Sequence, residues 1–218
     1  MKIVLWLLLA ASSAIAAPPS AKEILDTVRL QQTQQQLELE GQLREGETVV
    51  PFRFTQTGPV IRYSFSKPDE ALQLRLGEND SRLEVVTSEG VEKVTPAQFD
   101  HKIRGTAVTY EDLALRFLYW PNAKVIGDDT IGVVDCWRLE LRAPPRQSQY
   151  PTVRLWVQKD GPAIMKVEGY DSNGKLSKRF TVISGQKIEG RWFLKQMRIQ
   201  EFDSATGKPS LTYLEINK

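Results

Sequence analysis

Residues 153–176, VRLWVQKDGPAIMKVEGYDSNGKL, decide the fold class of this chain. Val153, Leu155 and Val157 alternate with other residues, which is the period of a β-strand, whereas Trp156 points to the opposite face. The run that follows the first turn also has apolar residues on both parities. A sheet with one solvated face would alternate apolar and polar residues more strictly. The stretch therefore predicts strands whose two faces are both partly covered.

Turn sequences separate similar runs along most of the chain. The strongest is DSNG at 171–174, because glycine adopts positive φ without strain. One connection about every eight to twelve residues is typical of an antiparallel meander, and the crossover helices of a parallel sheet are missing. We predict about 11 strands, of which two late ones cover 175–185 and 186–203.

Two short helices interrupt the strand pattern. Ser20 and Glu23 form a capping-box pattern before apolar residues at helical spacing, which predicts a helix over 20–32. A second helix is predicted over 109–120, where Thr109 can cap the start. Its apolar stripe must pack on another element.

The fold class that follows is mainly β with two short helices. We predict an antiparallel, strongly curved, incomplete β-barrel whose concave interior is covered by the helices. A β-sandwich or a filled barrel, with its aromatics in an ordinary core, is the alternative. Periodicity does not distinguish a packed core from a lined interior.

The N-terminus is typical of a signal peptide. Lys2 precedes an apolar run too short to span a membrane, and Ala14-Ile15-Ala16 fits an A-x-A cleavage site. We predict a signal peptide over 1–17, a single domain over 18–218 and a location in the periplasm. The chain shows no second apolar run of membrane length.

Charge and reactive side chains exclude several function classes. Lys and Arg number 29 against 27 Asp and Glu, so the chain lacks the basic character of a nucleic-acid binder. Cys136 is the only cysteine and lies in a predicted strand, so we expect a buried structural thiol. His101, the only histidine, lies in a polar loop without a nucleophile elbow. We interpret Asp128 and Asp129 as turn acids, and predict no catalytic residue, metal or cofactor.

Four stretches carry a family resemblance. They are YEDLALRF at 110–117, GVVDCWRLELRAP at 132–144, the run at 150–180 and GRWFLKQMRIQ at 190–200. The chain resembles the outer-membrane lipoprotein-sorting family, whose fold is similar to that of the LolA-like and LolB-like periplasmic carriers. The resemblance implies a helix-lidded half-barrel that holds acyl chains of a lipid or lipoprotein in a Gram-negative envelope.

One departure from that family lies in an early strand. Its carriers have an Arg-Pro pair there, but the comparable stretch, FRFTQTGPVIRYSF at 52–65, has Arg53 and Arg62 and no Arg-Pro. No closing residue is carried over to this chain.

The leading hypothesis is a monomeric periplasmic carrier, or chaperone, for acyl chains in lipoprotein sorting and transport, which meets membrane-anchored donor and acceptor proteins transiently. The alternative is a sensory or regulatory module of the same fold that binds a membrane-anchored signalling partner, and an enzyme comes third. The predicted lipid-binding residues of the interior are Phe117, Leu118, Trp137, Met165 and Trp192.

Overall fold

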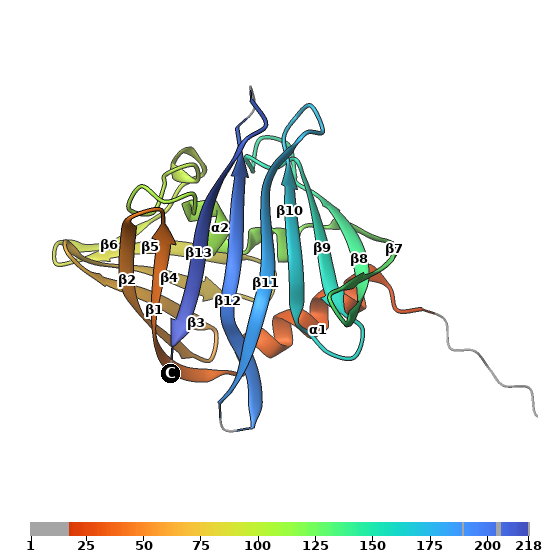
Figure 1. The fold of residues 1–218 in the computed structure, drawn as a ribbon, viewed down its shortest axis with the longest axis horizontal. Coiled ribbons are helices and arrows are strands. Elements are labelled where there is room, and N and C mark those ends of the chain that lie inside the picture. Colours follow the sequence, from red (N-terminus) through yellow and green to blue (C-terminus); the bar gives the residue numbers. More distant parts are fainter. Residues whose placement is uncertain (1–17, 189, 204–205, 218) are drawn as a thin grey trace, which may run out of the picture.

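A computed structural model describes residues 18–188, 190–203 and 206–217, so the predicted signal peptide lies outside the described residues. Within these ranges the strands form a single antiparallel sheet of 13 strands, in the order β6-β5-β4-β3-β2-β1-β13-β12-β11-β10-β9-β8-β7. The sheet curves strongly, and its edge strands β6 and β7 do not pair, so it remains open (Figure 1). The prediction of a curved, incomplete barrel is confirmed.

The strands have the following bounds: β1 Gln36–Glu45, β2 Thr48–Thr57, β3 Val60–Ser66, β4 Asp69–Leu76, β5 Ser81–Thr87, β6 Gly90–Lys93, β7 Asn122–Ile131, β8 Val134–Arg142, β9 Thr152–Gln158, β10 Ile164–Tyr170, β11 Leu176–Ile188, β12 Arg191–Phe202 and β13 Pro209–Asn217. The expected number of strands was slightly low. Short β6 is exposed at every position.

Helix α1, Ala21–Thr33, begins at the predicted capping box. The Ser20 backbone N–H donates to the Glu23 carboxylate at 2.8 Å, and the Glu23 N–H donates to the Ser20 hydroxyl at 3.3 Å. The buried face of the helix consists of Ala21, Ile24, Leu25 and Val28. Burying each of the three larger side chains contributes roughly 1.5–3 kcal/mol, so packing fixes α1 on the sheet.

The second predicted helix is shorter than expected. Helix α2 covers Tyr110–Ala114, and a 3₁₀ turn, η2, covers Arg116–Tyr119. Leu115 between them has φ 50°, a left-handed conformation that ends the α-helix. The Ala114 carbonyl accepts a hydrogen bond from the Ser81 hydroxyl of β5 at 2.5 Å, so the sheet occupies the carbonyl that ends the helix. Another 3₁₀ turn, η1, covers Pro96–Gln98.

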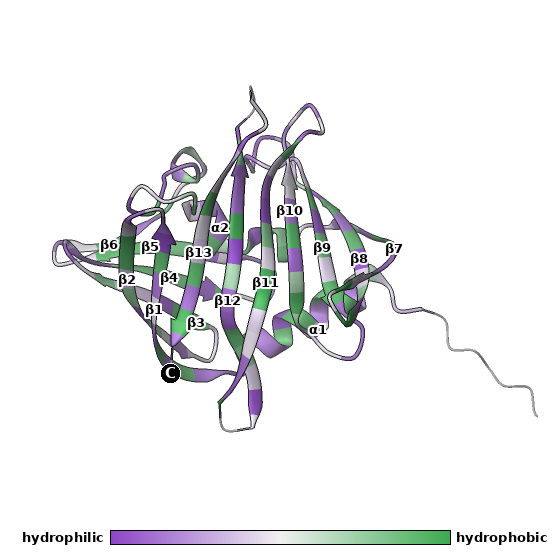
Figure 2. Ribbon diagram, in the orientation of Figure 1, coloured by the Kyte–Doolittle hydropathy of each residue, from purple (hydrophilic) through white to green (hydrophobic). Residues whose placement is uncertain are grey.

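Two apolar clusters fill the two ends of the curved sheet. The first packs β1–β5 against residues 94–115 and includes Phe52, Leu72 and Leu74. The second packs α1 against β8 and β9 and includes Val28, Leu139 and Leu155. Hydrophobic and hydrophilic residues alternate along many strands (Figure 2). Leu115 and Tyr119 contact both clusters, so η2 and the residue before it lie where the clusters meet.

Two local predictions are wrong. Asp128 and Asp129 lie within β7, where they pair with Trp137 and Cys136 of β8, and not in a turn. The strand predicted to end at residue 185 continues as β11 to Ile188, so its hairpin is longer than expected. Glycine at 185 suggested a turn, but this strand interior tolerates it beside the Trp192 ring.

Candidate functional site

The concave face of the central strands is apolar and only half-buried. Cross-strand pairing places Val182 of β11 opposite Met197 of β12, and Met197 opposite Leu214 of β13. These three side chains are half-buried, as are Phe180 and Val167 in the neighbouring row. Phe180, Met197 and Leu214 pack against the first cluster and Val167 packs against the second, so the central floor lies between the two clusters.

A hollow opens beside α1. It has a volume of about 420 Å³ and lies between the C-terminal half of α1 and the end of β4. Its lining residues are Asp26, Arg29, Leu30, Thr33, Leu76, Gly77 and Glu78. Leu30 is 58% exposed there, whereas Leu76 is buried. The volume lies within the range of about 300–1,000 Å³ that small-molecule sites span.

Few polar contacts hold α1 over this hollow. Arg29 donates to the Leu118 carbonyl of η2 at 2.8 Å and lies over the Tyr119 ring. The Gln56 amide of β2 donates to the Gln32 carbonyl near the end of the helix. The buried Tyr119 hydroxyl finds no hydrogen-bond partner among the described residues.

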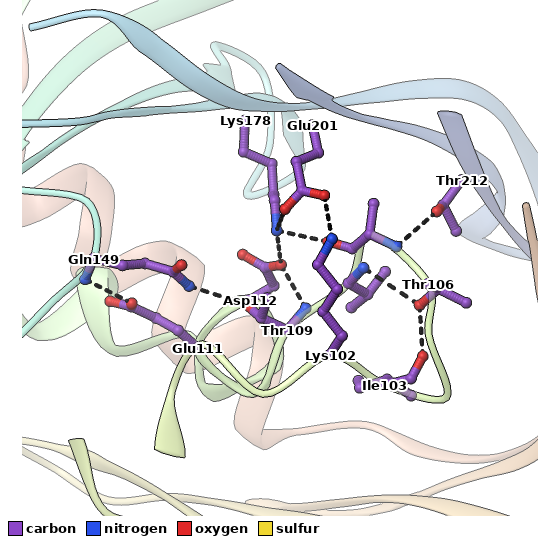
Figure 3. A network of polar contacts seen from close by, with 12 residues as sticks. Lys102, Ile103, Thr106, Thr109, Glu111, Asp112, Gln149, Lys178, Glu201 and Thr212 are labelled. Atoms are coloured by element: carbon purple, nitrogen blue, oxygen red, sulfur yellow. Dashed lines mark hydrogen bonds and ion pairs between the residues drawn. The ribbon is translucent and has the colours of Figure 1, made fainter. Parts of the chain in front are cut away.

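A buried polar network holds α2 inside the sheet (Figure 3). Lys178 of β11 is 1% exposed, and its ammonium donates to the Asp112 carboxylate at 2.9 Å and to the Ala107 carbonyl at 2.6 Å. The Asp112 carboxylate also accepts from the Thr109 backbone N–H at 2.8 Å, which caps α2. A buried charge is stable only when it is paired in this way, so Lys178 fixes the position of α2.

Two further contacts complete the network. The Tyr150 hydroxyl donates to Asp112 at 3.0 Å, and burial raises the pKa of Tyr150 well above its ordinary value. The Tyr150 ring lies against Gly169, where a Cβ atom would come within 2.7 Å of it. The Ala107 N–H donates to the Glu45 carboxylate at 2.7 Å. The loop before α2 is thus bound to both β1 and β11.

Glu111 on α2 is buried, and no cation of the described residues lies within ion-pair distance of it. Burial raises its pKa, although the Ser148 hydroxyl and the Gln149 N–H, the latter at 2.9 Å, donate to the carboxylate and oppose that effect. These bonds join α2 to the connection between β8 and β9. They add to the network that prevents α2 from moving independently of the sheet.

The opposite, convex face carries a ladder of ion pairs. Glu140 of β8 lies between Lys124 of β7 and Arg154 of β9, at 3.3 Å and 3.2 Å. Burial would raise the pKa of Glu140, but the hydrogen bonds from these cations outweigh it, so its pKa is lowered. Glu168 of β10 continues the ladder to Arg179 of β11 at 2.8 Å. Polar pairing therefore covers the face that the helices do not.

The structure separates the five predicted lipid-binding residues. Leu118 is 1% exposed within the second cluster, and Phe117 and Trp137 are half-buried against that cluster. Met165 is half-buried at an irregularity in β10. Trp192 lies near the tip of the β11–β12 hairpin and is 69% exposed. The first three surround the α1 side of the interior, whereas Trp192 lies away from them.

His101 and Cys136 lie as the sequence suggested. His101 is an exposed loop residue beside the Tyr110 ring. Cys136 is buried and its thiol contacts the Val134 carbonyl at 3.4 Å, and burial raises its pKa. Nowhere in the described ranges do three or more His, Cys, Asp or Glu side chains gather as metal ligands.

Sequence reasoning missed the most buried ion pair. Lys178 and Asp112 are 66 residues apart, and both lie in stretches that read as an exposed strand end and a helix start. The central floor residues Phe180, Val182 and Met197 were also missed. Their alternation along β11 and β12 was a usable signal, but it did not show which face is concave.

Comparison with known proteins identifies the fold. A family model described as that of an uncharacterized protein matches residues 77–218. No curated protein matches the chain. None of the helices in the described part is long and apolar enough to cross a membrane.

Three solved structures are similar over almost the whole chain. A domain assigned to outer membrane lipoprotein-sorting proteins, from Vibrio parahaemolyticus, is 18% identical, with a TM-score of 0.68 and coverage of 91% of this chain and 90% of that one. A DUF1329 family protein from Desulfovibrio piger is 20% identical, with a TM-score of 0.66 and 91% of each chain covered. A LolA superfamily protein from Nitrosomonas europaea is 16% identical, with a TM-score of 0.65 and coverage of 92% and 93%. At these identities the likeness shows a shared fold.

Proposed function

This chain belongs to the family of uncharacterized proteins whose model it matches and has the LolA-like fold, and from this premise we propose that it is a periplasmic carrier of acyl chains. The chains belong to lipids or lipoproteins in outer-membrane lipoprotein sorting. They lie on the concave floor, whose half-buried apolar residues are the single observation that carries the proposal.

The energetics favour a carrier of this kind. Each buried methylene contributes about 0.8 kcal/mol, so a sixteen-carbon chain gains roughly 12 kcal/mol on leaving water. The concave floor offers apolar contacts from Phe180, Val182 and Met197. The chain binds over β10–β13, where these side chains are half-buried, and enters beside α1.

Delivery of the acyl chain requires that the free energy gained by burying it is partly offset. The cargo must displace α1 or the side chains beneath it, and that displacement reduces the net affinity. The few polar contacts of α1 make it the cover that moves, whereas the buried Lys178–Asp112 pair keeps α2 in place. Donor and acceptor proteins anchored in the two membranes are the expected partners.

Native mass spectrometry of protein purified from its own cell envelope tests the proposal. We expect a bound species with the mass of a diacyl or triacyl lipid, and displacement of a fluorescent fatty-acid probe by palmitate. His101→Ala is expected to change neither result, because that side chain is exposed and outside the interior. Recovery of empty protein that takes up no probe would overturn the proposal.

A further inference from the structure

The β11–β12 hairpin projects beyond the sheet. Pairing of β11 with β10 begins at Thr181, and pairing of β12 with β13 begins at Gln196. In the described part of these strands, residues 184–188 and 191–194 pair only with each other. The hairpin extends below the rest of the sheet (Figure 1). We call this end of the hairpin, residues 183–188 and 190–195, the ribbon.

One side of the ribbon is already covered. Ile188 is 9% exposed and packs with Leu39 of β1 and Ile216 of β13. Phe193 and Leu194 pack against the same cluster. These contacts fix the direction of the ribbon, since a two-stranded hairpin alone is marginally stable in water.

Trp192 remains outside that packing. It is 69% exposed, and the other tryptophans in the described residues are buried or half-buried. The Lys187 ammonium lies 5.2 Å from the centre of its ring, and a Cβ atom at Gly185 would lie 3.2 Å from the ring edge. The absence of a side chain at Gly185 leaves room for the ring, so the indole is held in place while its outer surface faces water.

The charge of the ribbon is positive. Residues 183–195 contain Lys187, Arg191 and Lys195 against Glu189, which gives 3 − 1 = +2. The three cations are exposed, and none forms an ion pair with a carboxylate in the described residues. An exposed tryptophan among exposed cations matches the interface of an anionic bilayer, where indole rings lie at the headgroup level and cations meet lipid phosphates.

We propose that the ribbon is a membrane-docking element that inserts Trp192 into the headgroup region of an anionic phospholipid bilayer. The inference rests on the proposed function, because docking places the floor and α1 beside the membrane that supplies or accepts the acyl chain. The ribbon continues β11 and β12, which carry Phe180, Val182 and Met197. The acyl chain then passes along these two strands.

Flotation with vesicles of phosphatidylethanolamine and phosphatidylglycerol tests docking, with phosphatidylcholine vesicles for comparison. We expect the protein to float with the anionic vesicles. Trp192→Ala weakens partitioning about tenfold, and Arg191→Ser weakens it about fivefold. Val133→Ala, at a β7–β8 turn residue that is 98% exposed, leaves it unchanged. The Trp192 fluorescence shifts to the blue on vesicle addition and this shift is absent in Trp192→Ala.

The fatty-acid probe assay separates this inference from the proposed function. Trp192→Ala is expected to bind the probe as the unchanged protein does, because Trp192 lies outside the interior. Equal flotation of Trp192→Ala and the unchanged protein, or flotation of neither, would overturn docking even if the probe binds. Flotation that depends on Trp192 in a protein that takes up no probe would support docking and overturn the carrier function.

Discussion

Helix α1 and helix α2 both lie in the concave face, but the sheet holds them by different forces. Four buried apolar side chains fix α1, together with hydrogen bonds from Arg29 to the Leu118 carbonyl, at 2.8 Å, and from the Gln56 amide to the Gln32 carbonyl. Helix α2 is held by the buried Lys178–Asp112 pair and by hydrogen bonds from Ser81 of β5 and from Tyr150 in the β8–β9 connection. Apolar contact is non-directional and tolerates a shift, whereas a buried ion pair has one favourable geometry. Under the proposed carrier function, this difference makes α2 the fixed part of the interior and α1 the cover that moves.

The largest effect is expected for Asp112→Ala. It leaves the Lys178 ammonium buried without its carboxylate, and removing one partner of a buried pair costs about 3–5 kcal/mol. Urea unfolding measures this loss. Glu201→Ala is the matched control, because Glu201 is 28% exposed and lies 3.7 Å from Lys178, so its loss costs less than about 1 kcal/mol. Equal losses of unfolding free energy in the two variants would contradict the claim that the buried Lys178–Asp112 pair holds α2.

Leu25→Ala is the corresponding change in α1. Leu25 is 3% exposed, and truncating a buried leucine costs about 2–4 kcal/mol. Hydrogen exchange followed by mass spectrometry is expected to show that α1 opens more readily, while Tyr110–Ala114 keeps its protection. If both helices lose protection together, α1 and α2 form one cooperative unit and α1 is not a separate cover.

Carboxylates on the convex face and on α2 are expected to change the stability of the protein with pH in opposite directions. Burial would raise the pKa of Glu140 and Glu168, but hydrogen bonds from their cationic partners, Lys124 and Lys166 among them, lower it. Their contribution is present above the unfolded pKa and is lost as the pH falls through the folded pKa. Glu140→Gln with Glu168→Gln is expected to flatten the acid limb in urea unfolding. An unchanged acid limb would contradict the assigned ladder.

The pKa of Glu111 on α2 shifts in the opposite direction to those of Glu140 and Glu168. Burial raises its pKa, so its ionisation destabilises the folded state as the pH rises from the unfolded pKa through the folded one. Glu111→Gln is expected to remove this loss, so stability no longer declines over that range. A decline of the same size in the variant would show that Glu111 ionises without cost.

The smallest effect is expected for Ser20→Ala. The change removes one half of the capping box, which contributes about 1 kcal/mol to helix stability. Because α1 is held mainly by packing, hydrogen exchange is expected to show faster opening of its first turn alone. Lys22→Ala is the control, since the Lys22–Asp26 pair is largely exposed. Global destabilisation by Ser20→Ala would mean that the cap is coupled to the whole sheet.

Local patterns predicted the parts of this fold that depend on neighbouring residues. The capping box at Ser20 and the turn at 171–174, where the Gly174 N–H donates to the Asp171 carbonyl at 3.0 Å, are both confirmed. The left-handed Leu115 was missed because its cause lies in β5, where Ser81 binds the last helical carbonyl. The length of the β11–β12 ribbon was missed because Gly185 reads as a turn residue.

The candidate site was less predictable than the fold. An aromatic side chain in a strand does not show whether it faces a cluster, as Trp137 does, or water, as Trp192 does. Lys178 reads as an exposed lysine until its partner, 66 residues away, is brought beside it. Both cases depend on which face of the sheet becomes concave, and that is set by contacts between distant segments.

Fatty-acid probe binding by two adjacent variants of β11 tests the central claim most directly. Val182 faces the concave floor opposite Met197, and Ile183 is its neighbour on the convex face, 46% exposed. The account predicts that Val182→Asn weakens probe binding by about tenfold, because it places an amide against the acyl chain, and that Ile183→Asn leaves binding unchanged. Equal binding by the two variants, or a loss confined to Ile183→Asn, would contradict it.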